Sequence, residues 1–294
     1  MVRKSKREQA RGRCIFCGAD GLTKEHVFSD WLKALVPDTA DHYEYGRYSG
    51  SSAERAIDLD WFFNGPTVIR KRNGPARSIK ERVVCGTCNS GWMSKIVDEA
   101  KPIVERIALE RSCALTHLEQ DRLANWLALC CVMNLQQRRV RTYSLTTENT
   151  LKEFCVNKRR PDGWLIRIGR YSGPRETGIF GWTQFIELKE DGPDARPTGI
   201  QTVSTYNIGR LLVQVLTRQG EPFKSRQYTK RQYNDSHFHP DGMVLIPTAD
   251  AGPINVPRQY VSDPEYEWIR RRYFFDQAMI DAAQPLIKPA AGPG

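Results

Sequence analysis

The chain has 294 residues, of which 40% are hydrophobic, so it can bury a sizeable core, and its length favours two domains over one. Its formal net charge of +10 favours polyanionic partners. No apolar run approaches the length of a membrane span, and the first residues lack the apolar stretch of a signal peptide. These features exclude an integral membrane protein and a secreted disulfide scaffold, so we expect a soluble, cytoplasmic protein with no membrane partner.

The basic charge is concentrated in an N-terminal arm, residues 1–13. This arm holds six Lys or Arg and one Glu, and so contributes +5 to the net charge. Such an arm would attract the phosphate backbone of a nucleic acid without regard to its sequence. The alternative is a solvated, disordered tail, which a run of like charges also favours.

We expect the first domain to span residues 14–112. It opens with the turn CIFCGADGL and continues into TKEHVFSDWLKALV, which is extended at first and then helical. Residues 41–80 are rich in Tyr, Ser, Gly and Arg and are interpreted as an insertion of short strands or loops. After a second turn, VVCGTCNSGW, the apolar spacing from Ile96 to Ile107 predicts a helix with a kink at Pro102.

The second domain, residues 113–294, is predicted to mix helix and sheet. Thr116 and Glu119 form a capping-box signature ahead of a mostly buried helix over 118–135. A further helix is predicted over about 147–156. Short apolar or alternating runs typical of strands then follow, namely WLIRI, IFGWTQFIEL, residues 201–206, LLVQVL and MVLI. The predicted fold class is therefore α+β, and target selection, a protein partner or homo-oligomer formation all remain open as roles for this region.

Four of the eight cysteines form two Cys-x-x-Cys pairs, Cys14 with Cys17 and Cys85 with Cys88. The two intervening residues turn the chain so that both sulfurs can reach one tetrahedral ion. Gly18 directly follows the first pair and Gly86 lies within the second, and both pairs are in polar turns. Together the pairs predict one four-cysteine zinc site that closes a long loop. Such a site has no coordination position left for substrate, so the zinc would be structural. Disulfides or unrelated thiols are the alternatives.

Any chemistry must come from residues that a shared zinc brings together. Glu25 and His26 follow the first cysteine pair, and Asn89 directly follows the second. If Cys17 and Cys88 bind one ion, the segments after them lie close in space. Glu25 and Asn89 then offer the oxygen ligands that Mg²⁺ or Mn²⁺ prefers. His26, with an unperturbed pKa of about 6.5, is a candidate general base.

The order CIFCG, TKEHVF and VCGTCNSGW resembles the zinc-containing HNH endonucleases, in the subgroup with Glu-His at the first motif and Cys-Asn after the second cysteine pair. The resemblance covers residues 14 to about 100. It implies a ββα-metal fold and an endonuclease that hydrolyses phosphodiester bonds, expected in DNA, and leaves a 5′ phosphate. The implied roles are His26 as general base, Glu25 and Asn89 as ligands of a catalytic Mg²⁺ or Mn²⁺, and structural zinc on Cys14, Cys17, Cys85 and Cys88.

A competing hypothesis is a zinc-ribbon module that binds nucleic acid or a protein partner and has a degenerate, non-catalytic nuclease site. In that case Asn89 would only cap the helix that follows it, since Asn is a favoured N-cap residue. Other residues whose side chains could take part in a reaction or bind a ligand are interpreted as structural, either in core packing or at a strand end and turn. These are Cys130, Cys131, Trp92 and Met93 in the core, and His237 and His239 at the strand end.

Overall fold

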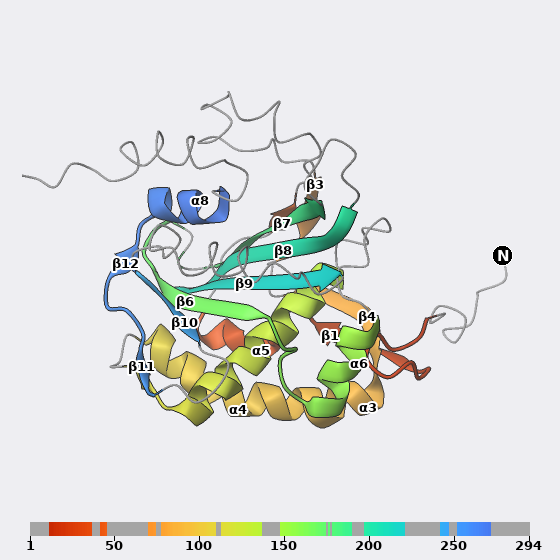
Figure 1. The fold of residues 1–294 in the computed structure, drawn as a ribbon. Coiled ribbons are helices and arrows are strands. Elements are labelled where there is room, and N and C mark those ends of the chain that lie inside the picture. Colours follow the sequence, from red (N-terminus) through yellow and green to blue (C-terminus); the bar gives the residue numbers. More distant parts are fainter. Residues whose placement is uncertain are drawn as a thin grey trace, which may run out of the picture.

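The computed structural model describes residues 12–36, 42–45, 70–74, 78–109, 113–136, 148–174, 176, 178–189, 197–220, 242–246 and 252–271. These residues form a mixture of helices and sheet, which confirms the α+β class at that level (Figure 1). Most of the predicted arm, most of the predicted insertion, and both His237 and His239 lie outside the described residues. Within the described part of the chain, no helix is long and apolar enough to cross a bilayer.

The helical segments are η1 (Asp30–Ala34), α3 (Gly86–Cys88), η3 (Asn89–Met93), α4 (Ser94–Ala108), α5 (His117–Gln136), α6 (Glu148–Asn157) and α8 (Asp263–Arg271). The strands are β1 (Leu22–His26), β2 (His42–Tyr45), β3 (Arg70–Asn73), β4 (Lys80–Cys85), β5 (Ala114–Leu115), β6 (Leu165–Tyr171), β7 (Ile179–Lys189), β8 (Pro197–Ile208), β9 (Leu211–Gly220), β10 (Met243–Ile246), β11 (Ile254–Asn255) and β12 (Tyr260–Val261).

The central sheet has the strand order β10-β6-β9-β8-β7, with antiparallel neighbours. The short strand β12 pairs in parallel with the end of β6, beyond the part that pairs with β10. The five predicted strand segments of the second half are therefore confirmed. Side chains on both faces of β6 and β9 are buried, and these include polar ones: Arg167 of β6 donates a hydrogen bond to Gln214 Oε1 of β9 at 3.0 Å.

Helix α5 is the central helix of the core and lies against one face of the sheet (Figure 1). The predicted capping box starts it: Thr116 Oγ1 accepts from the Glu119 N–H at 3.3 Å, and Glu119 Oε2 accepts from the Thr116 N–H at 2.9 Å. Arg106 of α4 lies 2.8 Å from Glu119, which ties α4 to α5. Cys130 and Cys131 are buried on α5, which confirms their interpretation as core residues.

The opposite face of the sheet carries α8, whose Tyr266 and Ile269 are buried in a small apolar cluster with Tyr171 and Leu212 (Figure 1). The ring of Tyr171 lies 5.3 Å from that of Tyr266. The sheet is therefore a middle layer, with α5 on one face and α8 on the other. This is the reason that it has buried apolar side chains on both faces.

The N-terminal segments share their core with α5 and the sheet. A single apolar cluster includes Phe16 of the first cysteine turn, Leu32 of η1, Trp126 of α5 and Val213 of β9. The Trp31 ring lies 5.8 Å from the Trp126 ring. This packing holds β1 and β4 on the same framework as the central sheet. The division into two domains at 112/113 remains a prediction.

Helix α4 confirms the helix predicted after the second cysteine pair. It buries Ile96, Ile103 and Ile107 on one face, as their spacing requires. The chain leaves helical dihedral angles at Gly91, where φ is −96° and ψ is −109°, and α4 continues through Pro102 without interruption. The bend in this segment is thus at Gly91, next to the cysteines.

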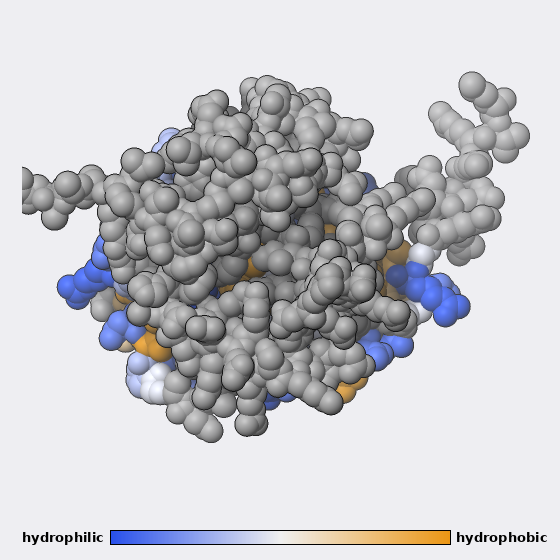
Figure 2. Space-filling view, turned by 45° about the horizontal axis from the view of Figure 1, so that its top comes forward, coloured by the Kyte–Doolittle hydropathy of each residue, from blue (hydrophilic) through white to orange (hydrophobic). Residues whose placement is uncertain are grey.

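Few large apolar side chains of the described residues reach the surface. In Figure 2 the described residues on this face are mostly hydrophilic, with small and separate hydrophobic areas. The exposed ones are Leu109, Leu118 and Val156. Leu109 and Leu118 lie at the two ends of the connection between α4 and α5. Neither is close in sequence to the cysteine pairs.

Candidate functional site

The first cysteine pair lies in a turn that is closed by its own backbone. The Cys14 N–H donates to the Ala19 carbonyl and the Gly18 N–H to the Cys14 carbonyl, each at 2.8 Å. Gly18 has a φ of +73°, a left-handed conformation that disfavours any side chain. The Ile15 N–H donates to the Val83 carbonyl at 2.9 Å, so the turn is fixed to β4, which carries the second pair.

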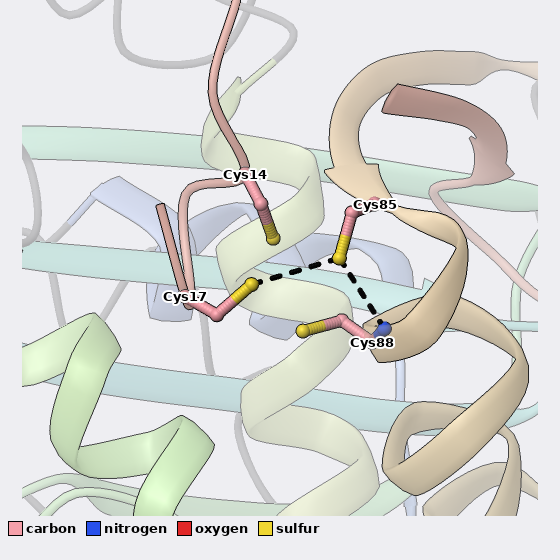
Figure 3. Close-up of side chains that lie close together, drawn as sticks. All are labelled: Cys14, Cys17, Cys85 and Cys88. Carbon is pink, nitrogen blue, oxygen red and sulfur yellow. Dashed lines mark hydrogen bonds between the residues drawn. The ribbon is translucent and has the colours of Figure 1, made fainter. Parts of the chain in front are cut away.

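The second pair begins where β4 ends. Cys85 is the N-cap of α3, and its sulfur accepts a hydrogen bond from the Cys88 N–H at 3.5 Å. Figure 3 shows the sulfurs of Cys14, Cys17, Cys85 and Cys88 pointing toward one another. All four lie within 4.8 Å of each other, and Cys17 Sγ is 3.6 Å from Cys85 Sγ. Tetrahedral zinc with bonds of about 2.3 Å requires sulfurs about 3.8 Å apart. The four cysteines are therefore placed to bind a metal such as zinc.

The cysteines carry no disulfide, and three of the four are buried, while Cys17 is exposed. Burial raises the pKa of Cys14, but hydrogen bonds from the backbones of Cys17, Cys85 and Phe16 outweigh it and lower the pKa to about 7. A thiolate is the form that binds metal. Backbone groups of Phe16 and Cys17 in the turn, together with that of Cys85, thus favour the metal-binding form of Cys14.

Trp92 packs beside the sulfur cluster. Its ring meets Phe16 edge-on at 5.0 Å, and Lys158 Nζ lies 5.1 Å from its centre, within cation-π range. Its indole N–H is buried and makes no hydrogen bond of ordinary geometry to a described residue. Burial raises the pKa of the Cys88 thiol, and the nearby Trp92 indole acts in the opposite direction. Trp92 and Met93 are core residues, as predicted, and Trp92 also contacts a cysteine of the cluster.

The strand pair β1 and β4 positions the residues that follow the first cysteine turn. Thr23 lies opposite Val84 and Glu25 opposite Glu81, because the register shifts by one residue between them. Thr23 and Glu25 are half-buried. β4 ends at Cys85, and the helical turn α3 follows. This turn places Asn89, four residues after Cys85, beside Thr23 of β1.

Asn89 meets Thr23 and Glu25. Its Nδ2 donates to Thr23 Oγ1 at 3.1 Å, and Thr23 Oγ1 in turn donates to the Val84 carbonyl at 3.2 Å. Burial raises the pKa of Glu25, and a hydrogen bond from the Asn89 side chain partly offsets this. The structure thus brings Glu25 and Asn89 together. The helix cap is Cys85, and Asn89 has helical dihedral angles, so the interpretation of Asn89 as N-cap is wrong.

His26 ends β1 and faces a different partner. Its Nε2 lies 3.9 Å from Asp30 Oδ1, and its side chain is 22% exposed. Burial and the positive charge of Lys80 lower the pKa of the imidazole, which favours its neutral form. Among the described residues, no hydrogen bond is found between the imidazole of His26 and Glu25 or Asn89.

Sequence reasoning did not identify three residues of this region. Thr23 contacts Asn89, Asp30 faces His26, and Lys80 lies opposite His26 in the strand pair. The spacing of four between His26 and Asp30 was a visible signal. The contacts of Thr23 and Lys80 depend on the strand register, which no local motif specified.

The arrangement consists of a sulfur cluster and, beyond it on β1, a carboxylate that contacts an amide, Glu25 with Asn89. The imidazole of His26 is the next side chain in β1 and faces Asp30. In the described part of the chain, the four cysteines are the group of three or more His, Cys, Asp or Glu residues with metal-binding geometry. Glu25 and Asn89 supply one carboxylate and one amide, which suits a cation that keeps several waters. Comparison of the chain with protein-family models, with curated proteins and with solved structures found no match.

Proposed function

We propose that this protein is a metal-dependent endonuclease that hydrolyses phosphodiester bonds in DNA. The observation that carries the proposal is the contact between Glu25 and Asn89, which the cysteine turns bring together; His26 directly follows Glu25 at the end of β1. The order of an antiparallel strand pair, β1 with β4, and a following helix also agrees with the ββα-metal arrangement that the motif resemblance implies.

Each residue has a role in this proposal. Glu25 and Asn89 would hold Mg²⁺ or Mn²⁺, which supplies stabilisation of negative charge on the phosphate and the leaving 3′ oxygen. His26 takes a proton from water as the water oxygen bonds to phosphorus, and the bond to the 3′ oxygen breaks, leaving a 5′ phosphate.

The charges around His26 suit an anionic substrate. Lys33 is ion-paired with Asp30 at 3.1 Å, whereas Lys80 is exposed and has no ion pair within the part of the chain that the structure describes. A free ammonium beside the general base favours binding of a phosphate. Zinc on Cys14, Cys17, Cys85 and Cys88 would remain structural and keep Asn89 against β1.

The test is cleavage of supercoiled plasmid with Mg²⁺ or Mn²⁺ by the wild type and by His26→Ala. The matched control is His117→Ala, since His117 is an exposed imidazole beside Asp121 on α5. We expect wild type and His117→Ala to cleave and His26→Ala to lose most of its activity, while a chelator stops all cleavage. Equal cleavage by His26→Ala, or no wild-type cleavage of DNA or RNA, contradicts the proposal.

One observation favours the second candidate, a zinc-stabilised module that binds nucleic acid or a protein partner without cleaving it. His26 is in contact with Asp30 and not with the Glu25 and Asn89 pair. This candidate predicts zinc and DNA binding that survive Glu25→Gln and Asn89→Ala, with no hydrolysis by any variant. The plasmid assay separates the two.

A further inference from the structure

We propose that Thr23 is a positioning residue that fixes the orientation of the Asn89 side-chain amide, so that Asn89 Oδ1 is left free for a divalent cation beside Glu25. This inference rests on the proposed function. It concerns a hydroxyl on β1 for which the cysteine and Glu-His motifs assign no role.

The first step is the hydroxyl proton of Thr23. Thr23 Oγ1 lies 3.2 Å from the Val84 carbonyl oxygen, to which it donates. A hydroxyl has one proton, so with that proton on the carbonyl, Oγ1 can only accept a further hydrogen bond. The strand register keeps Thr23 opposite Val84, so the carbonyl stays within reach of the hydroxyl.

The second step is the choice between the two ends of the Asn89 amide. An acceptor at Thr23 Oγ1 selects Nδ2, which donates to it at 3.1 Å. The reversed amide would set Oδ1 against an oxygen with no proton to offer, and that contact is repulsive. The hydrogen bond from Asn89 to the Glu25 carboxylate selects the nitrogen in the same way. Both acceptors therefore favour one orientation.

The third step is the state of Asn89 Oδ1. No described residue donates a hydrogen bond to it, since the hydrogen bonds of the side chain go from the nitrogen to Thr23 and Glu25. An amide oxygen without a donor, in a residue next to a carboxylate, can accept a hard cation or one of its waters. Without the Thr23 hydroxyl, one of the two acceptors that hold this orientation is lost.

The test is Mn²⁺ binding, followed by the electron paramagnetic resonance signal of free Mn²⁺ in zinc-loaded protein. The variants are Thr23→Val, which removes the hydroxyl at nearly constant shape, and Thr23→Ser, which keeps it. We expect wild type and Thr23→Ser to bind one Mn²⁺ equally, and Thr23→Val to bind roughly 10-fold more weakly, as for other residues that orient a metal ligand. Zinc content and unfolding temperature are measured for each variant.

A second pair of variants separates positioning from a merely structural role. In Asn89→Asp both terminal atoms are oxygens, so the orientation of the group no longer matters. We therefore expect Thr23→Val to cost no Mn²⁺ affinity in the Asn89→Asp background. The same loss in both backgrounds, or Mn²⁺ binding by Thr23→Val equal to wild type, overturns the inference and leaves the proposed function intact. Failure of the wild type to bind Mn²⁺ overturns both.

Discussion

Nδ2 of Asn89 donates a hydrogen bond to Oγ1 of Thr23 at 3.1 Å, although 66 positions separate the two residues in the chain. The contact closes the same long loop as the cysteines, since Cys17 and Cys85 approach each other next to it. Metal binding at the sulfurs and the geometry of Glu25 with Asn89 are thus linked through β1 and β4.

Loss of a cysteine of the cluster is expected to remove the zinc. Cys88→Ser should reduce bound zinc from about one per chain to a small fraction and lower the unfolding temperature, because three sulfurs bind the ion less tightly. Plasma mass spectrometry and thermal unfolding measure both quantities. Cys155→Ser is the control, since Cys155 lies on α6 outside the cluster. Full zinc content in Cys88→Ser would contradict the four-sulfur site.

The indole N–H of Trp92 is expected to strengthen zinc binding at Cys88. Trp92→Phe keeps an aromatic ring to pack on Phe16 but removes the buried indole N–H, which lowers the pKa of the Cys88 thiol. We expect roughly 10-fold weaker zinc affinity in competition with a chromophoric chelator. Phe154→Leu serves as a packing control, because Phe154 contacts the same ring at 5.5 Å without a polar group. Unchanged affinity in Trp92→Phe would show that the N–H has no such effect.

Lys80 is expected to contribute to DNA binding at the site. Lys80→Met should lower the rate of plasmid cleavage at low DNA concentration and reduce the slope of log rate against log salt by about 1, the change expected for one phosphate contact. Lys95→Met is the matched control, because Lys95 lies on α4 near Glu99. Equal salt dependence of Lys80→Met and wild type would show that Lys80 does not contact a DNA phosphate.

Glu119 is expected to stabilise the fold in a pH-dependent way. Burial raises its pKa, but hydrogen bonds from Thr116 and Arg106 outweigh this, and the net pKa is lowered. A lowered folded-state pKa gives stability that is present above the unfolded pKa and lost as pH falls through the folded one.

Glu119→Gln should therefore cost about 1 kcal/mol in urea unfolding at about pH 7, and less at about pH 3.5. Glu105→Gln is the control, since Glu105 makes an exposed ion pair with Lys101 at 3.9 Å. A cost for Glu119→Gln that grows as the pH falls would reverse the expected sign.

Local patterns predicted much of this structure. The capping box placed the start of α5, and two residues between cysteines were enough to predict the sulfur cluster, because both depend on short-range geometry. From that cluster the meeting of Glu25 and Asn89 followed as a consequence of chain connectivity.

Features that depend on the pairing of distant segments were not predictable in the same way. The contact of Thr23 with Asn89 depends on the pairing of Thr23 with Val84 in β1 and β4, and a slip of one residue would turn Thr23 to the other face. The parallel pairing of β12 with β6 depends on packing across the whole sheet. Likewise, no local motif indicated the break in helical dihedral angles at Gly91, whereas Pro102, where a kink was predicted, lies within the continuous helix α4.

The most direct test of the account compares two carboxylates that face each other across the strand pair. Glu25 lies opposite Glu81, and Glu25 is the one that contacts Asn89. End-labelled duplex DNA is incubated with Mn²⁺ and zinc-loaded wild type, Glu25→Gln or Glu81→Gln. We predict cleavage to 5′ phosphate ends by wild type and by Glu81→Gln, and loss of at least roughly 100-fold in rate for Glu25→Gln. Cleavage by Glu25→Gln at the wild-type rate would contradict the proposed metal site.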